Sequence, residues 1–140
     1  MTGDDREYLF DQAQQLSELL NEECVELLGM LEKIEDRVMI SRRINKIEDD
    51  ADHVFHAFAD RLHEVESDIE KRDYIFKMAR HIEECVDMID ELSMTIVRYN
   101  TRAVNQGMKA SINAIAGCAK KEIHLLNLMR TYEPEKQELF

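Results

Sequence analysis

Residues 40–65 read ISRRINKIEDDADHVFHAFADRLHEV, and their apolar side chains recur at steps of three and four residues. Such steps keep returning to one face of an α-helix, which makes one turn in about 3.6 residues. The near-heptad rhythm is typical of helices that pack in bundles. The segment is therefore predicted to be a long helix, whose apolar stripe consists of Ile40, Ile44, Ile47, Ala51, Val54, Phe55, Phe58, Leu62 and Val65.

Three other segments show the same spacing and predict three more helices, whose apolar stripes run over about residues 5–31, 75–96 and 108–129. The sole proline, Pro134, lies near the C-terminus, where it cannot interrupt a helix. We expect an all-α, antiparallel three- to four-helix bundle that forms one domain over residues 1–140, with residues 133–140 as a loose tail. The stripes are Phe10, Ala13, Leu16, Leu20, Cys24, Leu27 and Leu31; Ile75, Met78, Ala79, Ile82, Val86, Ile89, Leu92 and Ile96; and Met108, Ile112, Ile115, Ala119, Ile123, Leu126 and Met129.

The connection between the second and third helices contains a helix-start signal. Ser67 followed by Glu70 matches a capping box, in which the serine hydroxyl accepts from the amide of residue 70 and the glutamate reaches back. We therefore expect the second helix to end near Glu64 and the third to begin near Asp68. The turn between them is then short, and the two helices are antiparallel neighbours.

Composition limits the partners of the chain. Its 140 residues are 44% apolar and 34% charged, as in folded proteins, and its net charge of -12 argues against nucleic acid and anionic membranes. No apolar run approaches the ~20 residues that span a bilayer, and the N-terminus lacks a basic segment followed by an apolar one. We expect a cytoplasmic protein without direct membrane insertion.

The cysteines give no motif. Cys24, Cys85 and Cys118 are an odd number, widely spaced, without a C-x-x-C pair, and each lies on an apolar helical pattern. We expect buried, reduced thiols.

Two pairs of carboxylates stand out as candidate ligands. Glu48 and Asp52 are four residues apart on the second helix, and Glu83 and Asp87 are four apart on the third. Each pair projects from one face, about 6 Å apart along the helix axis. Such pairs are common by chance in an acidic chain, but Glu48 and Glu83 lie at the borders of the apolar stripes. They are therefore expected at the helix interface, where a charge is costly unless it is paired.

The antiparallel turn predicts which carboxylates face each other. It places Glu48 level with Asp87 and Asp52 level with Glu83. Carboxylates that converge at one level repel each other unless protons or cations neutralise them, and such hard oxygen ligands suit Mg, Mn, Fe or Ca. Asp90, three residues after Asp87, is a further candidate ligand. His56, four residues after Asp52, is an imidazole candidate that would favour Fe, Zn or Ni.

Several alternatives stay open at this level. The four carboxylates could form a solvated face that pairs with Arg42, Arg43 or Arg80, and His56 could be a surface histidine. The protein could then be a metal-free helical dimerisation module. A ferritin-like di-iron oxidoreductase needs Glu-x-x-His units on two helices. The nearest matches, Asp50/His53 and Asp60/His63, lie on one helix, so we expect no enzyme activity.

The acidic segments resemble those of the PhoU-like proteins, specifically the branch called domain of unknown function 47. The resemblance is carried by Ile44-Asn45-Lys46-Ile47-Glu48-Asp49-Asp50-Ala51-Asp52 and by Ile82-Glu83-Glu84-Cys85-Val86-Asp87-Met88-Ile89-Asp90, and it extends from about Asp5 to Tyr132. It implies a helical bundle whose E-x-x-x-D motifs, here Glu48, Asp52, Glu83 and Asp87, bind multinuclear metal clusters, often of iron or zinc. It also implies a role in controlling low-affinity phosphate transporters.

The chain departs from this family in length. Members usually have two tandem bundles, whereas this sequence ends where the second would begin. We expect a homodimer or higher oligomer that covers the apolar surface left by the missing half. The expected function is metal-binding regulation of phosphate uptake at the cytoplasmic face of a transporter. The expected cofactors are divalent or ferric ions, namely Fe, Zn, Mn, Ni or Mg.

Overall fold

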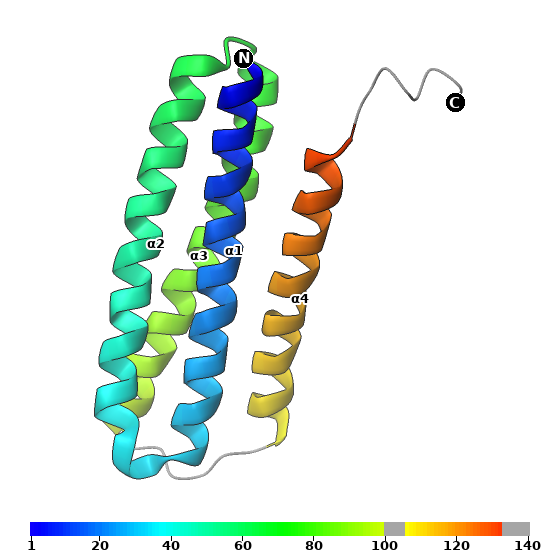
Figure 1. Cartoon of the computed structure of the whole chain (residues 1–140). Coiled ribbons are helices and arrows are strands. Elements are labelled where there is room, and N and C mark those ends of the chain that lie inside the picture. The colour runs from blue at the N-terminus through cyan, green and yellow to red at the C-terminus, as the bar shows by residue number, and fades with distance from the viewer. Residues whose placement is uncertain (100–105, 133–140) are drawn as a thin grey trace.

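The computed structural model describes residues 1–99 and 106–132, and within them it confirms the all-α fold (Figure 1). Four long helices are present, with one short 3-10 turn between the first two. The elements are α1 (Gly3–Glu32), η1 (Ile34–Asp36), α2 (Arg37–Val65), α3 (Ile69–Tyr99) and α4 (Gln106–Arg130). The predicted loose tail, residues 133–140, lies outside the described residues.

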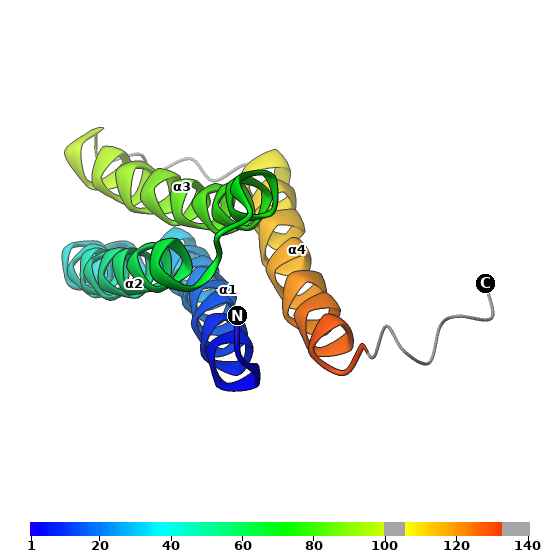
Figure 2. The same cartoon turned by 90° about the horizontal axis from the view of Figure 1, so that it is seen from above.

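Helix α1 is the centre of the bundle. Its backbone lies close to those of α2, α3 and α4, whereas the α4 backbone lies close to that of α1 and not to that of α2 or α3 (Figure 2). The helices α1, α2 and α3 form a compact three-helix unit because α2 and α3 also pack on each other. The core contains the predicted stripes, with Leu16, Cys24, Leu27 and Ile44 fully buried. The fourth helix thus adds a single layer to one side of the unit.

The turn between α2 and α3 confirms the predicted helix ends to within one residue, but the capping residue is different. Helix α2 ends at Val65 and α3 begins at Ile69. The Oδ1 atom of Asp68 accepts a hydrogen bond from the Lys71 amide at 3.1 Å, so Asp68 is the cap and the assignment of Ser67 was wrong. Both residue types accept amide hydrogen bonds at a helix start, and sequence spacing does not separate adjacent candidates.

The α1–α4 contact joins helices of opposite charge. Helix α1 has one basic residue, Arg6, among many acidic ones, whereas α4 has four basic residues and a single acidic one, Glu122. Arg130 of α4 forms ion pairs with Glu7 and Asp11 of α1. Arg6 donates to the carbonyl oxygens of Met129 and Arg130, which lie at the C-terminus of α4. Charge therefore helps to attach α4 to the three-helix unit.

The structure corrects part of the cysteine prediction. All three thiols are free, but Cys24 alone is buried, and Cys85 and Cys118 are exposed. Their apolar neighbours in the sequence face the core, whereas these two thiols lie at the edges of their stripes. Among the described residues, no helix is both long enough and apolar enough to cross a membrane.

Candidate metal centre

The predicted carboxylate pairs of α2 and α3 come together halfway along the bundle. Asp87 hydrogen-bonds to both Glu48 and Glu83, and Asp52 lies close enough to Glu83 to raise its pKa. The pairing of Glu48 with Asp87 and of Asp52 with Glu83 follows from the antiparallel turn, as the sequence predicts. A hydrogen bond between two carboxyl groups needs a proton, so without a cation Asp87 shares protons with these glutamates.

A buried glutamate of α1, Glu23, joins this group and was not predicted. Its side chain is fully buried, and neither carboxylate oxygen has a hydrogen-bond partner among the described residues. Asp90, Glu48 and Asp87 are close enough to raise its pKa by charge repulsion. Glu23 is thus directed from the central helix toward the acidic residues of α2 and α3. We call the set Glu23, Glu48, Asp52, Glu83, Asp87 and Asp90 the acidic cluster.

Asp90 lies at the inner side of the acidic cluster. Its side chain is buried, and its carboxylate accepts hydrogen bonds from the Asn45 amide nitrogen at 3.3 and 3.5 Å. The Ser93 hydroxyl donates to the Asp90 backbone oxygen and lies 3.1 Å from the Ser41 hydroxyl. These contacts fix the position of Asp90 beside Glu23. Asp90 therefore lies within the group, and its role as a metal ligand stays a prediction.

His56 lies at the outer rim. Its Nδ1 atom is 2.8 Å from the Asp52 backbone oxygen and 3.3 Å from Asp52 Oδ1, and two thirds of its side chain is exposed. Nδ1 thus faces Asp52, and Nε2 is the nitrogen without that contact. The hydrogen bond to the Asp52 backbone raises the pKa of the imidazole. The negative charges of Asp52, Asp60 and Glu83 raise it further. The position fits a surface histidine that pairs with Asp52.

Burial is the main cause of the unusual pKa values in the acidic cluster. Desolvation, followed by repulsion from Asp90, Glu48 and Asp87, raises the pKa of Glu23 to about 9. Desolvation and the hydrogen bonds to Asp87 raise the pKa of Glu48 and of Glu83 to about 7 each. Burial also raises the pKa of Asp90, against the opposing effect of Asn45. At neutral pH and without a cation, protons neutralise part of the cluster.

Two of the three arginines considered as alternative partners, Arg43 and Arg80, form ion pairs outside the acidic cluster. Arg43 pairs with Glu26 at 3.0 Å, and Arg80 pairs with Glu84 at 3.3 Å. Arg80 is still near enough to lower the pKa of Glu83, although this effect is smaller than the burial that raises it. These contacts leave the charge of the acidic cluster without a direct ion pair from Arg43 or Arg80.

The acidic cluster offers carboxylate oxygens, which are ligands for hard cations. Within residues 1–99 and 106–132, however, no set of three or more His, Cys, Asp or Glu side chains already has the geometry to hold a metal ion. Coordination would require side-chain rotations around Asp87 that replace the shared protons. The unpartnered oxygens of Glu23 would gain a partner by such a change.

The sequence did contain a signal for Glu23. It lies three residues after Leu20 and four before Leu27, so it occupies a position of the apolar stripe of α1. An acidic residue at a core position is costly unless it is neutralised. The four-residue spacing of carboxylates does not mark Glu23, because the residues four positions away from it, Leu19 and Leu27, are apolar.

The di-iron alternative gains no support from the histidines. His53 Nδ1 lies 2.7 Å from the backbone oxygen of Asp49, and the side chains of His53 and His63 are exposed on α2.

The chain matches no family model, and neither a curated protein nor a solved structure is significantly similar to it.

Proposed function

We propose that this protein is a helical-bundle regulator that binds hard metal ions at the acidic cluster. The observation that carries the proposal is Glu23, a fully buried carboxylate without a hydrogen-bond partner in the described residues, beside Glu48, Asp87 and Asp90. A buried carboxylate of this kind is destabilising unless a proton or a cation neutralises it. A cation would stabilise several carboxylates at once, whereas each proton neutralises one.

The positions of the six carboxylates in the acidic cluster fit a bound cation. Glu23 contributes from α1, Glu48 and Asp52 from α2, and Glu83, Asp87 and Asp90 from α3, so a bound cation would connect all three helices. All six ligands are carboxylates, which favours Mg, Mn or ferric iron over the softer ions. His56, at the rim of the acidic cluster, would bind a cation only through its Nε2 atom. Binding is expected to release the protons that Glu48 and Glu83 share with Asp87.

The physiological role that we propose follows from the resemblance of the acidic segments to PhoU-like proteins. In this view the chain acts at the cytoplasmic face of a phosphate transporter, and metal occupancy sets the rigidity of the surface that α2 and α3 present. No catalytic step is proposed. A direct test is phosphate uptake by vesicles that contain a low-affinity phosphate transporter, with and without the purified chain. An unchanged uptake rate would remove this role and leave the metal site as a separate question.

The metal site is tested by elemental analysis of protein purified without a chelator or a histidine tag. Glu23→Gln removes the buried carboxyl group, and Glu22→Gln, an exposed neighbour on the same helix, is the matched control. We expect bound metal in the wild type and in Glu22→Gln, with a marked loss in Glu23→Gln. A metal-free wild type that also gives no heat on titration with Mn²⁺ would refute the proposal and leave the helical module as the better account.

A further inference from the structure

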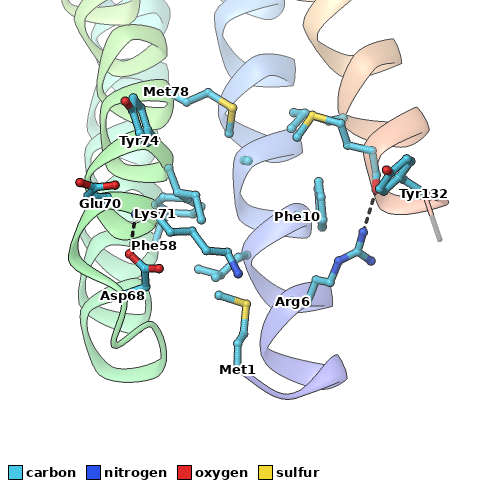
Figure 3. Close-up of a pocket in the computed structure, with 15 residues that line it drawn as sticks. Met1, Arg6, Phe10, Phe58, Asp68, Glu70, Lys71, Tyr74, Met78 and Tyr132 are labelled. Atoms are coloured by element: carbon cyan, nitrogen blue, oxygen red, sulfur yellow. Dashed lines mark hydrogen bonds between the residues drawn. The ribbon is translucent and has the colours of Figure 1, made fainter. Parts of the chain in front are cut away.

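A second feature lies at the end of the bundle, where the α2–α3 turn and the N-terminus of α1 meet the C-terminus of α4. Because the α4 backbone lies close to that of α1 but not to that of α3, a groove with a volume of about 610 Å³ opens between α3 and α4 (Figure 3). Its floor is formed by Leu9, Phe10 and Phe58, and its α3 side by Ile75 and Met78. The groove contains no member of the acidic cluster.

Exposed apolar side chains border this groove on both sides. Tyr74 on the α3 side is 73% exposed, and Met129 and Tyr132 on the α4 side are also exposed. Beside them, Leu125 and Leu128 are each 55% exposed, on the side of α4 that is turned away from its buried residues Ile112, Ala119 and Leu126. We call Leu125 and Leu128 the α4 ridge. A concave and a convex apolar surface therefore lie next to each other on one molecule.

The charges around the two surfaces are complementary. Lys120 and Lys121, one turn before the α4 ridge, form no ion pair within residues 1–99 and 106–132. Glu70 on the α3 border of the groove also has no ion pair within that part of the chain. The other groove cations are engaged, since Lys71 pairs with Glu66 at 3.1 Å and Arg6 donates to the end of α4. The two lysines beside the α4 ridge and the glutamate at the groove border thus have no counter-charge within the described residues.

We propose that the groove is the docking site for the α4 ridge of a second copy of this chain. In a dimer with twofold symmetry, each surface meets the matching surface of the partner, so that a ridge next to a groove makes two equivalent contacts. Leu125 and Leu128 of one copy enter the groove of the other, and Lys121 lies opposite Glu70. The contact covers the exposed apolar side chains of both molecules and neutralises both unpaired charges.

The first test measures self-association by sedimentation equilibrium over a range of micromolar concentrations. The Leu125→Glu/Leu128→Glu variant should weaken dimerisation by roughly tenfold or more, because it places charge in an apolar contact. Val25→Glu, on an equally exposed residue of α1 outside the groove, should leave it unchanged. Circular dichroism establishes that each variant is folded. A monomeric wild type, or equal weakening by both variants, would overturn the proposal.

The second test identifies the facing surfaces by charge reversal. Lys121→Glu and Glu70→Lys should each weaken the dimer, and the double variant should recover much of the loss, since it restores opposite charges in exchanged positions. A double variant that is no tighter than either single variant would overturn the assigned orientation. The test is independent of the metal site, because Glu23→Gln should still form the dimer.

Discussion

The middle of the bundle and its end near the α2–α3 turn bury opposite kinds of surface. In the middle, three helices bring carboxylates together, and Glu23 is fully buried without a hydrogen-bond partner in the described residues. At the end, the same helices bring Phe58, Leu9 and Ile75 together beneath a groove that stays open. In the middle of the bundle, carboxyl groups are buried without a counter-charge among the described residues. At the end, apolar side chains stay exposed to water. We infer that one region is completed by a cation and the other by a protein surface.

The largest expected effect lies at the apolar end. Phe58 is 1% exposed and contributes to the floor of the groove. Phe58→Ala should lower the free energy of unfolding by about 3–5 kcal/mol, because it removes buried apolar surface and leaves a cavity. Urea denaturation in chelator and in excess Mn²⁺ should give the same loss. A loss that depends on metal would show that the two regions are coupled, which would break the comparison.

The next effect is the pH dependence that Glu23 imposes on the middle of the bundle. Burial raises the pKa of Glu23 to about 9, from an ordinary value of 4.5. Between these values the folded state keeps a proton that the unfolded state has released, so the stability of the metal-free protein should fall as the pH rises. The fall should be up to about 1.4 kcal/mol per pH unit.

Glu23→Gln should flatten this part of the profile and stabilise the metal-free protein at alkaline pH. Denaturant unfolding in chelator between pH 5 and 9, with Glu22→Gln as the control, measures the difference. If Glu23→Gln and the wild type show parallel profiles, Glu23 is not the group that limits stability at high pH.

Asp87→Asn is expected to have a smaller effect on the melting temperature, with one sign in chelator and the opposite sign in excess Mn²⁺. Asp87 hydrogen-bonds to Glu48 and Glu83, and its charge raises the pKa of both. Removing the charge relieves repulsion, so the melting temperature in chelator should rise by a few degrees. Removing a ligand weakens the cation site, so the melting temperature in excess Mn²⁺ should fall. Identical shifts in the two conditions would show that Asp87 is not a ligand.

The smallest effect is expected for the substitution of Arg80, which lies at the edge of the acidic cluster. Arg80 pairs with Glu84 at 3.3 Å, with both side chains about half exposed. Exposed pairs contribute little, so Arg80→Ala should change the free energy of unfolding by less than about 0.5 kcal/mol. Thermal unfolding at low and high salt measures this change. A loss above 1 kcal/mol that disappears at high salt would mean that Arg80 neutralises the cluster itself.

The acidic cluster was found only in part from the sequence. The antiparallel turn correctly predicted that Glu48 meets Asp87 and that Asp52 lies near Glu83, because helix geometry and a short connection fix the register of neighbouring helices. Glu23 was missed because its partners are on other helices, and no local spacing joins it to them. Its position in the apolar stripe of α1 was the available signal.

The sequence by itself determined the helices, their approximate ends and their inward faces, because the three- and four-residue spacing of apolar side chains is a local property of the chain. Only the tertiary structure decided that the α4 backbone lies close to α1 and not to α3, since an apolar stripe does not specify which helix it packs against. That choice opens the groove and exposes the α4 ridge. The tertiary structure also decided the burial of Glu23, because the water lost by a side chain depends on all the helices that surround it.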